Sequence, residues 1–342
     1  MTGLLKIPGA KKPKPAPEPK VREKAEPLPK PSAALKMPGA EEVVVVDGPR
    51  RILISEPGMY FDMPSEDYFS EPCPEPALTN TGIGILINQS PEHFAYNHPA
   101  IGQPPAERRA TIAMHRGSVV HRLALGAGKD YSVINAPDFT GADARSARAY
   151  AERKGKVPIL KGHFEQAQAQ ANILYGHIKE VLHGEPFLSE VVVAWKVETS
   201  HGEIWARCMV DAWCPTLMRA VDIKSTTDAS EEAVIKRMVD GGYDTQDVWY
   251  RKGIEHVLGC FGRVAFTTLF SETKAPHCTH PVSINEAWAT SAWDLCEEAA
   301  ETFGRCMKEG RWPGYPRETQ KLAPPDWLIN QRLARRFSLE SM

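Results

Sequence analysis

The sequence predicts an α+β domain of the mixed α/β kind, in which a central mixed sheet with an antiparallel meander is flanked by helices. Apolar residues recur every three to four positions over 110–126, 163–183 and 286–308, which is typical of amphipathic helices. Between residues 190 and 226 the period changes to two, in segments rich in Val, Ile and Trp, which is typical of strands. Helical segments on either side of a block of strands favour a layered domain built around one sheet.

Length and composition narrow the class of protein. The chain has 342 residues, of which 42% are hydrophobic, enough for one large domain or two modest ones. No stretch approaches the roughly 18 consecutive apolar residues of a membrane span, and the Met1 end lacks the short apolar segment of a secretory signal. We therefore expect a cytoplasmic protein with no membrane partner. The seven cysteines include no C-x-x-C pair, so neither a disulfide framework nor a standard zinc or iron–sulfur ligand set is indicated.

Residues 1–45 are expected to form a disordered Lys/Pro-rich arm ahead of one domain at 55–340. The first 40 residues hold nine Lys/Arg, three Glu and nine of the 29 prolines, with almost no aromatic or β-branched residues. Such a segment buries too little apolar surface to offset the entropy lost on ordering. It would serve as a non-specific polyanion tether or a partner-docking tail, or only as a solubilising leader.

The elements can be placed along the chain. The stretch that ends at Pro76 is rich in proline and is expected to be irregular. The residues TNT at 79–81 are possible N-caps of a short helix, and Gly126 is a possible C-cap of the next one. In chain order we expect a strand at 41–47, the short helix after 79–81, helices at 110–126 and 163–183, strands at 190–198, 204–214 and 219–226, helices at about 229–240 and 244–258, strands at 263–271 and near Val282, a helix at 286–308 and a last helix after Pro325.

Two aspartates and a lysine on neighbouring strands form the most informative group. If the strands flanking the loop at 215–218 make a symmetric hairpin, Asp211 lies directly opposite Asp222. Directly opposed residues share a sheet face, with Cβ atoms about 4.5 to 5.5 Å apart, and the period of two places Lys224 on that same face. Two carboxylates and one ammonium group are therefore expected to converge.

The two opposed carboxylates need a compensating charge. At about 4 Å they repel each other by roughly 4 kcal/mol at an effective dielectric of 20. A divalent cation supplies the compensation, and oxygen ligands select a hard ion such as Mg²⁺ or Mn²⁺, which clamps phosphate oxygens and lowers the pKa of a bound water. Lys224 would orient or deprotonate that water, or stabilise charge that develops on phosphorus. The structural alternative is that these aspartates cap turns or pair with lysine, and a single D-x-K tripeptide is common.

His121 is a candidate ligand for the same metal. It follows Gly117 by four residues, so both lie on one face of the predicted helix, and the missing side chain of Gly117 is expected to let this helix approach another backbone closely. An imidazole delivered in this way could bind the ion. The alternative is a half-buried histidine with a backbone partner.

Substrate contacts are expected from two places. Gln246 and Tyr250 lie four residues apart on a predicted helix and could hold a nucleic-acid backbone or orient Lys224, although a polar surface pair is the plainer reading. The stretch 108–161, which includes Arg116, contains eleven Lys/Arg against four acidic residues. Such a basic stripe is typical of phosphate contacts, and a solvated basic face is the alternative. Arg116 is taken as a substrate-binding candidate.

In order along the chain, these motifs resemble the RecB-type branch of the PD-(D/E)-x-K nuclease superfamily, and within it the RecE-like exonuclease domain of exodeoxyribonuclease VIII. The motifs are G-x-x-x-H (Gly117, His121), Glu190 at the start of a strand, Asp211, D-I-K (Asp222, Ile223, Lys224) and Q-x-x-x-Y (Gln246, Tyr250), and the segment TNTGIGILINQSPEHFAYN resembles the opening helix of that domain. The likeness covers roughly residues 55 to 340. The D-I-K string replaces the E-x-K of many superfamily members but keeps its charge.

The resemblance implies a restriction-endonuclease-like core and a role for each matched residue. His121, Asp211, Asp222 and the carbonyl of Ile223 would hold Mg²⁺, and Lys224 would assist the attacking water. Gln246 and Tyr250 would support the site or contact DNA, and the role of Glu190 stays open. The RecE-like family digests one strand of linear duplex DNA from its 5′ end without ATP, passes the 3′ strand to an annealing protein, and forms a tetrameric ring.

The sequence therefore predicts a Mg²⁺-dependent, ATP-independent exodeoxyribonuclease that acts on double-stranded DNA ends in phage-type recombination. Two alternatives stay open at this point. One is a structure-specific or single-strand endonuclease of the same superfamily. The other is a non-catalytic DNA-binding recombination accessory, in which the acidic residues serve only the structure.

Overall fold

A computed structural model of the chain describes residues 52–102 and 110–340. The arm expected at 1–45 and the strand expected at 41–47 lie outside these residues. The described elements are β1 (Gly58–Tyr60), α1 (Ser65–Phe69), β2 (Ala77–Leu78), α2 (Asn80–Asn88), α3 (Pro91–Asn97), α4 (Ile112–Leu125), β3 (Tyr131–Ile134), α5 (Ala142–Arg153), β4 (Val157–Leu160), α6 (Lys161–Val181), β5 (Leu188–Thr199), β6 (Gly202–Cys214), β7 (Arg219–Thr226), α7 (Glu231–Asp240), α8 (Tyr243–Leu258), β8 (Ala265–Glu272), β9 (Thr279–Val282), α9 (Glu286–Glu309) and α10 (Asp326–Glu340).

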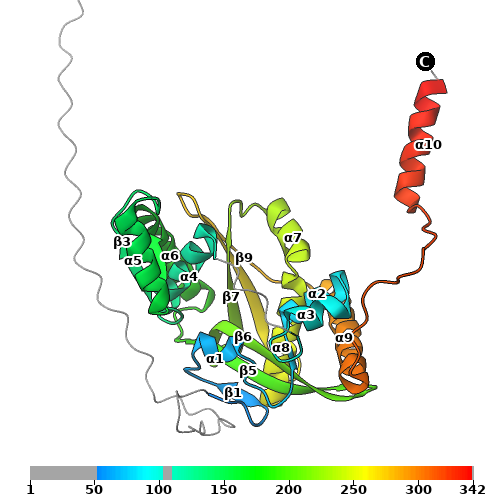
Figure 1. Cartoon of the computed structure of the whole chain (residues 1–342), viewed down its shortest axis with the longest axis horizontal. Helices are drawn as coiled ribbons and strands as arrows, with labels where there is room; N and C mark the ends of the chain where they lie inside the picture. Colours follow the sequence, from blue (N-terminus) through cyan, green and yellow to red (C-terminus); the bar gives the residue numbers. More distant parts are fainter. Residues whose placement is uncertain (1–51, 103–109, 341–342) are drawn as a thin grey trace, which may run out of the picture. The chain divides into compact units, whose positions relative to one another are not determined.

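A seven-stranded mixed sheet forms the centre of the fold (Figure 1). Its strands follow the order β1-β5-β6-β7-β8-β9, and β2 joins β6 in parallel. β5, β6 and β7 form the predicted antiparallel meander, whereas β7 and β8 run parallel. β3 and β4 make a separate parallel pair. The predicted mixed α/β fold with a central sheet and an antiparallel meander is confirmed.

Helices cover the sheet through two large apolar cores. The core that contains Leu174 and Ile178 of α6 also contains Val221 of β7 and Leu269 of β8, so it fixes α4 and α6 against these strands. The other core joins α2, α8 and α9 to β5 and β6. Each fully buried Leu or Ile side chain contributes roughly 1.5 to 3 kcal/mol through removal from water. The strands that carry the predicted site residues are therefore held between packed helices.

Most long elements lie where the sequence places them. Thr79 accepts a hydrogen bond from the Gly82 amide at the start of α2, and Gly126 ends α4 with a left-handed φ of 72°. The prediction that the stretch up to Pro76 is irregular is wrong, because this stretch contains β1 and α1. Met59 and Tyr68 in these elements are buried. Contacts with distant parts of the chain stabilise these short elements, and such contacts leave no periodic pattern in the local sequence. Within the described ranges, no helix is long and apolar enough to cross a membrane.

The alternation of side chains along β6 is interrupted near Asp211. Val210 and Trp213 belong to the same core, although residues three apart on a regular strand point to opposite faces. On the neighbouring strand, Glu190 has a φ of 50°. β5 pairs with β6 at Val191–Val210 and again at Ser189–Ala212, but the pair that would lie between them, Glu190 with Asp211, is not made. A positive φ is costly for a residue with a side chain and is common at functional sites.

Candidate active site

A fork in the sheet creates the space for the site. β5 pairs along one edge of β6. Two strands share the other edge: β2 pairs with Trp205 and Ala206, and β7 pairs with β6 from Ala212 onward. Residues 207–211 lie between these two pairings. A cavity of about 590 Å³ opens at the fork. It is lined by all of the predicted site residues except Arg116, namely His121, Asp211, Asp222, Ile223, Lys224, Gln246 and Tyr250.

The hairpin register is as predicted from the sequence. Ala212 pairs with Val221 and Cys214 with Arg219, so the next pair in the series would be Asp211 and Asp222. The regular ladder stops just before that pair. Instead, the Ile223 amide donates a 2.7 Å hydrogen bond to Asp211 Oδ2. The Asp211 carboxylate thus accepts the hydrogen bond that a backbone carbonyl would accept in a regular ladder, and this bond holds it beside Asp222.

Asp222 is the most enclosed carboxylate of the cavity, with 3% of its surface exposed. Gln246 Nε2 donates to its Oδ1 over 2.5 Å, and Lys224 Nζ lies 2.8 Å from its Oδ2. Burial, together with the Asp211 carboxylate and against the opposing effect of Lys224, raises the pKa of Asp222 above its ordinary value. The buried position therefore disfavours the ionised form unless positive charge is near.

Lys224 is positioned from two sides. Burial acts to lower the pKa of its ammonium, but the carboxylates of Asp222 and Asp211 outweigh burial, so the pKa lies above its ordinary value. The ammonium also lies 4.5 Å from the ring centre of Tyr243, at the start of α8, which is a cation–π contact. Tyr243 lines the cavity and was not predicted, because a single tyrosine at the start of a helix belongs to no motif.

His121 reaches the cavity from α4. Its Nδ1 lies 3.8 Å from Asp211 Oδ1, which is too long for a hydrogen bond. The close helix approach predicted at Gly117 is wrong as the reason for this position, because a Cβ added to Gly117 would meet no described atom within 4 Å beyond its own stretch of helix. Packing of α4 against α6 in the shared core positions His121 instead.

Glu190 adds a third carboxylate next to Asp211. Burial first, and the Asp211 charge second, raise the pKa of Glu190, while His121 and Arg122 act to lower it. Its Oε1 also lies against Gly128, where an added Cβ would come within 2.8 Å. The strained backbone of Glu190 therefore aims its carboxylate at the histidine side of the site.

Tyr250 and Arg116 lie in different surroundings. Tyr250 lines the cavity, packs edge-on against Phe266 at 5.9 Å, and has its pKa raised well above the ordinary value by burial. The guanidinium of Arg116 donates instead to Gln166 Oε1, at 3.0 Å, and to the carbonyl of Thr273. The structure therefore brings Tyr250 to the other site residues and does not bring Arg116 there.

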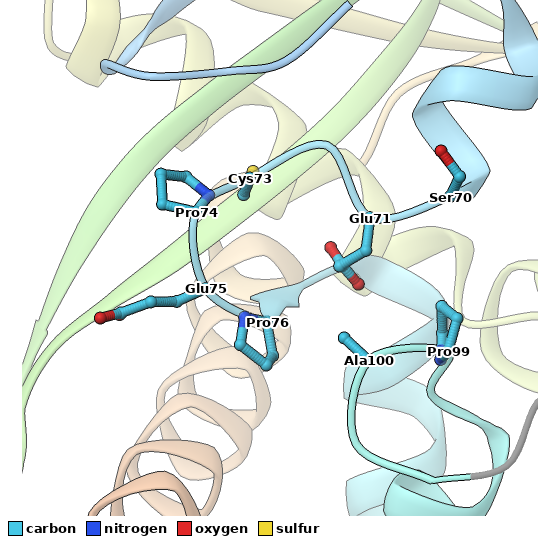
Figure 2. Close-up of a pocket in the computed structure, with 8 residues that line it drawn as sticks. All are labelled: Ser70, Glu71, Cys73, Pro74, Glu75, Pro76, Pro99 and Ala100. Atoms are coloured by element: carbon cyan, nitrogen blue, oxygen red, sulfur yellow. The ribbon is translucent and has the colours of Figure 1, made fainter. Parts of the chain in front are cut away.

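A buried polar cluster also lines the cavity. Glu71, which has a φ of 59°, forms an ion pair with Arg207 and lies 2.6 Å from Nε2 of His98, an imidazole whose pKa is lowered by burial to about 4. The Arg207 guanidinium also lies 5.2 Å from the ring centre of Tyr68. Figure 2 shows Glu71 among the residues around a smaller pocket, which has a volume of about 270 Å³, so this residue lines both cavities. The period of two puts Arg207 in line with Asp211, a signal that sequence reasoning could have used.

The donor set fits a hard divalent cation. Within the described residues, no group of three His, Cys, Asp or Glu side chains is closed around a common point. The separation of 3.8 Å between His121 Nδ1 and Asp211 Oδ1 is nevertheless less than twice the roughly 2.1 Å ligand distance of Mg²⁺, so both atoms can reach one ion. Three carboxylates line the cavity against the two cations Lys224 and Arg207, and this negative balance favours binding of a cation.

The fold and these residues define a PDDEXK-like protein, in which carboxylates and a lysine meet at a fork in a mixed sheet. The chain belongs to the family described as a PDDEXK-like domain of unknown function (DUF3799), whose model matches residues 86–322. PDDEXK nucleases generally use divalent metal ions. Membership in this family agrees with the resemblance to RecE-like nucleases and supports a nuclease.

One solved structure gives a similar result for the fold. A protein of Eubacterium rectale, named as a candidate exonuclease, is similar over 75% of this chain and 92% of its own, with a TM-score of 0.50 and 12% identity. A second structure, of a protein named SSO0001, covers 56% of this chain and 87% of its own at a TM-score of 0.24 and 15% identity. No curated protein matches the sequence. The first similarity supports the fold alone.

Proposed function

We propose that the protein is a Mg²⁺-dependent, ATP-independent exodeoxyribonuclease that digests linear double-stranded DNA. One observation carries the proposal: Asp211, Asp222 and Lys224 line a single cavity together with His121 and Gln246, although they come from four different elements. Family membership supports a nuclease, and the name of the Eubacterium rectale neighbour supports an exonuclease. Cytoplasmic location remains part of the proposal.

His121, Asp211, Asp222 and the Ile223 carbonyl would hold the metal ion. When bound, such an ion polarises a phosphodiester and lowers the pKa of a water molecule next to it. Gln246 fixes the Asp222 carboxylate through its 2.5 Å hydrogen bond, and Ile223 fixes that of Asp211. Lys224 is held as an ammonium by two carboxylates, which favours stabilisation of charge on the phosphate oxygens over removal of a proton.

The RecE-like resemblance extends the proposal beyond the site. We infer that digestion runs 5′ to 3′ and leaves 3′ single strands for phage-type recombination. An annealing protein would receive these strands, and four copies of the chain would form a ring. These statements rest on family likeness, and each needs its own measurement.

The test of the function uses linear duplex DNA labelled at either the 5′ or the 3′ end. We expect the wild type to digest it with Mg²⁺ or Mn²⁺, without ATP, and to stop in EDTA. Asp222→Ala and Lys224→Ala should each lose at least about 100-fold in rate, because transition-state charge is then unsupported. The matched controls are Asp294→Ala and Lys308→Ala, two exposed residues of α9.

The outcomes separate the readings of the sequence. Equal digestion by wild type, Asp222→Ala and Lys224→Ala would remove these residues from the chemistry. Cutting of covalently closed circles would identify an endonuclease instead. DNA retention without digestion, even in Mn²⁺, would identify the non-catalytic accessory. The order in which the two labels are released gives the direction.

A further inference from the structure

A small βαβ unit, which we call the wing, follows α4 and extends to the first residue of α6. It comprises residues 127–161 and contains the parallel strands β3 and β4 joined through α5. Figure 1 shows α5 and β3 beside α4 and α6. The wing holds seven Lys/Arg against four Asp/Glu. The site described above uses none of its charged residues.

The fold gathers four of these cations at one end of the wing. Tyr131 pairs with Val157, and the Val157 amide donates to the Asp130 carbonyl, so the residues just before β3 and β4 lie side by side. These residues include Lys129, which precedes β3, and the turn Arg153–Lys156, which precedes β4. Gly155 in this turn has a left-handed φ of 67°. The turn therefore projects its three cations at the same end as Lys129.

The charge of the turn at this end is not neutralised by any ion pair within the described part of the chain. Asp130 is engaged by Arg122 at 3.0 Å, and Glu152 by Arg148 at 2.8 Å. The three turn cations, Arg153, Lys154 and Lys156, are exposed and make no ion pair with any described residue. Positive charge left unpaired on a turn is available to an anionic partner.

The basic end of the wing is joined to the active site by short contacts. Ser189 Oγ donates to the Leu125 carbonyl over 2.7 Å, which ties the end of α4 to the start of β5. Gly128 packs against Glu190, and Lys129 is the next residue along the chain. Lys129 Nζ also lies 3.5 Å from Glu66 of α1. The basic end thus borders the histidine side of the cavity.

We propose that Arg153, Lys154 and Lys156 bind the sugar–phosphate backbone of duplex DNA outside the catalytic cavity. The inference rests on the proposed function, since it takes DNA as the substrate. Point charges on exposed turns contact phosphates without reading bases, so they supply affinity and register but no sequence preference. The wing would hold the duplex while one strand enters the cavity.

The experiment compares the triple variant Arg153→Gln, Lys154→Gln, Lys156→Gln with the wild type. A matched control replaces three exposed cations at and after the end of α9, in Lys308→Gln, Arg311→Gln, Arg317→Gln. Binding to a blunt 40-base-pair duplex is measured in EDTA from 50 to 200 mM salt. Three lost phosphate contacts reduce the slope of log K against log salt by about 2.7, so wild-type affinity should fall about 40-fold more than that of the triple variant over this range.

Hydrolysis is measured separately from binding. With Mg²⁺, the triple variant should digest long duplex more slowly than the wild type at 200 mM salt, whereas the two rates should match at saturating duplex concentration, where docking no longer limits hydrolysis. Identical salt slopes for the triple variant and the control would overturn the wing proposal, and digestion by the wild type would then leave the nuclease proposal intact. A slope that depends on the wing without any digestion would support DNA docking and overturn the nuclease.

Discussion

At the scale of single residues, the site is defined by carboxylates that the fold holds closer together than their charges favour. The Asp211 charge raises the energy of the ionised forms of Asp222 and of Glu190, the third carboxylate, which lies on the histidine side. One ammonium, that of Lys224, opposes them. Hydrogen bonds from Gln246 and from the Ile223 amide restrain the two aspartates, so the repulsion is not relieved by side-chain rotation.

Asp247, next to Gln246, gives a prediction for the pH dependence of stability. It is 1% exposed and forms an ion pair with Arg251 at 2.5 Å. Burial, against the opposing effect of Arg251, raises the pKa of Asp247 to about 6. Because the folded state holds this proton more tightly than the unfolded state, Asp247 lowers the free energy of unfolding progressively as pH rises from about 4 to about 6.

We therefore expect Asp247→Asn to gain stability relative to the wild type over that pH window, by up to roughly 3 kcal/mol. The measurement is urea unfolding of both proteins at pH 4, 5, 6 and 7. The absolute difference also includes the lost pair with Arg251, so the change of the difference with pH is the quantity to read. A difference that stays constant from pH 4 to 7 would show that Asp247 ionises normally in the fold.

At the scale of elements, α8 sets the position of the site because its first turns carry Tyr243 and Gln246 and its later turns pack on β5. The closest approach is at Gly253, where an added Cβ would lie within 2.5 Å of the Trp195 ring. Trp195 in turn packs against Trp249 with ring centres 5.2 Å apart. A glycine is required here because two bulky indoles already fill the interface.

Gly253→Ala should therefore lower the free energy of unfolding by roughly 1 to 3 kcal/mol, since overpacking forces the helix or the indole to move. Gly176→Ala in α6 is the matched control. A Cβ there meets no described atom within 4 Å, and alanine should raise stability by up to about 1 kcal/mol through helix propensity. Chemical denaturation measures both. Equal stability of the two variants would mean that the contact with Trp195 relaxes without cost.

The same packing explains what the sequence could predict. The hairpin register of β6 and β7 was predictable to the residue because a four-residue loop and a period of two determine which positions face each other. The caps Thr79 and Gly126 were equally local. Short elements such as β1 and α1 were not, because contacts with distant strands stabilise them. The Glu71–Arg207 pair joins residues far apart in sequence, so no local spacing of residues predicts it.

At the scale of the whole molecule, charge is distributed unevenly between the cavity and the wing. The cavity concentrates carboxylates between two apolar cores, and the wing presents cations beside it. A polyanionic substrate would be attracted by the cations of the wing and repelled by the carboxylates of the cavity. A nuclease with this arrangement needs a cation in the cavity before a phosphate can enter it. Metal binding and substrate binding should therefore be coupled.

Metal binding should also stabilise the fold, because the ion relieves the repulsion between Asp211 and Asp222 only in the folded state. With Mg²⁺ or Mn²⁺ at about 100 times its Kd, linkage adds roughly 2.7 kcal/mol, which for a chain of this size raises the Tm by about 5 °C. Thermal melts with the ion and with EDTA measure this shift without any substrate. Asp211→Asn and Asp222→Asn should lose most of it, whereas Asp294→Asn, on the surface of α9, should keep it. The two site variants should also be more stable than the wild type in EDTA, since each removes one of two repelling charges and keeps an amide for hydrogen bonding. Equal shifts in all four proteins would place the bound ion away from the fork, and the carboxylates would then need another source of compensation.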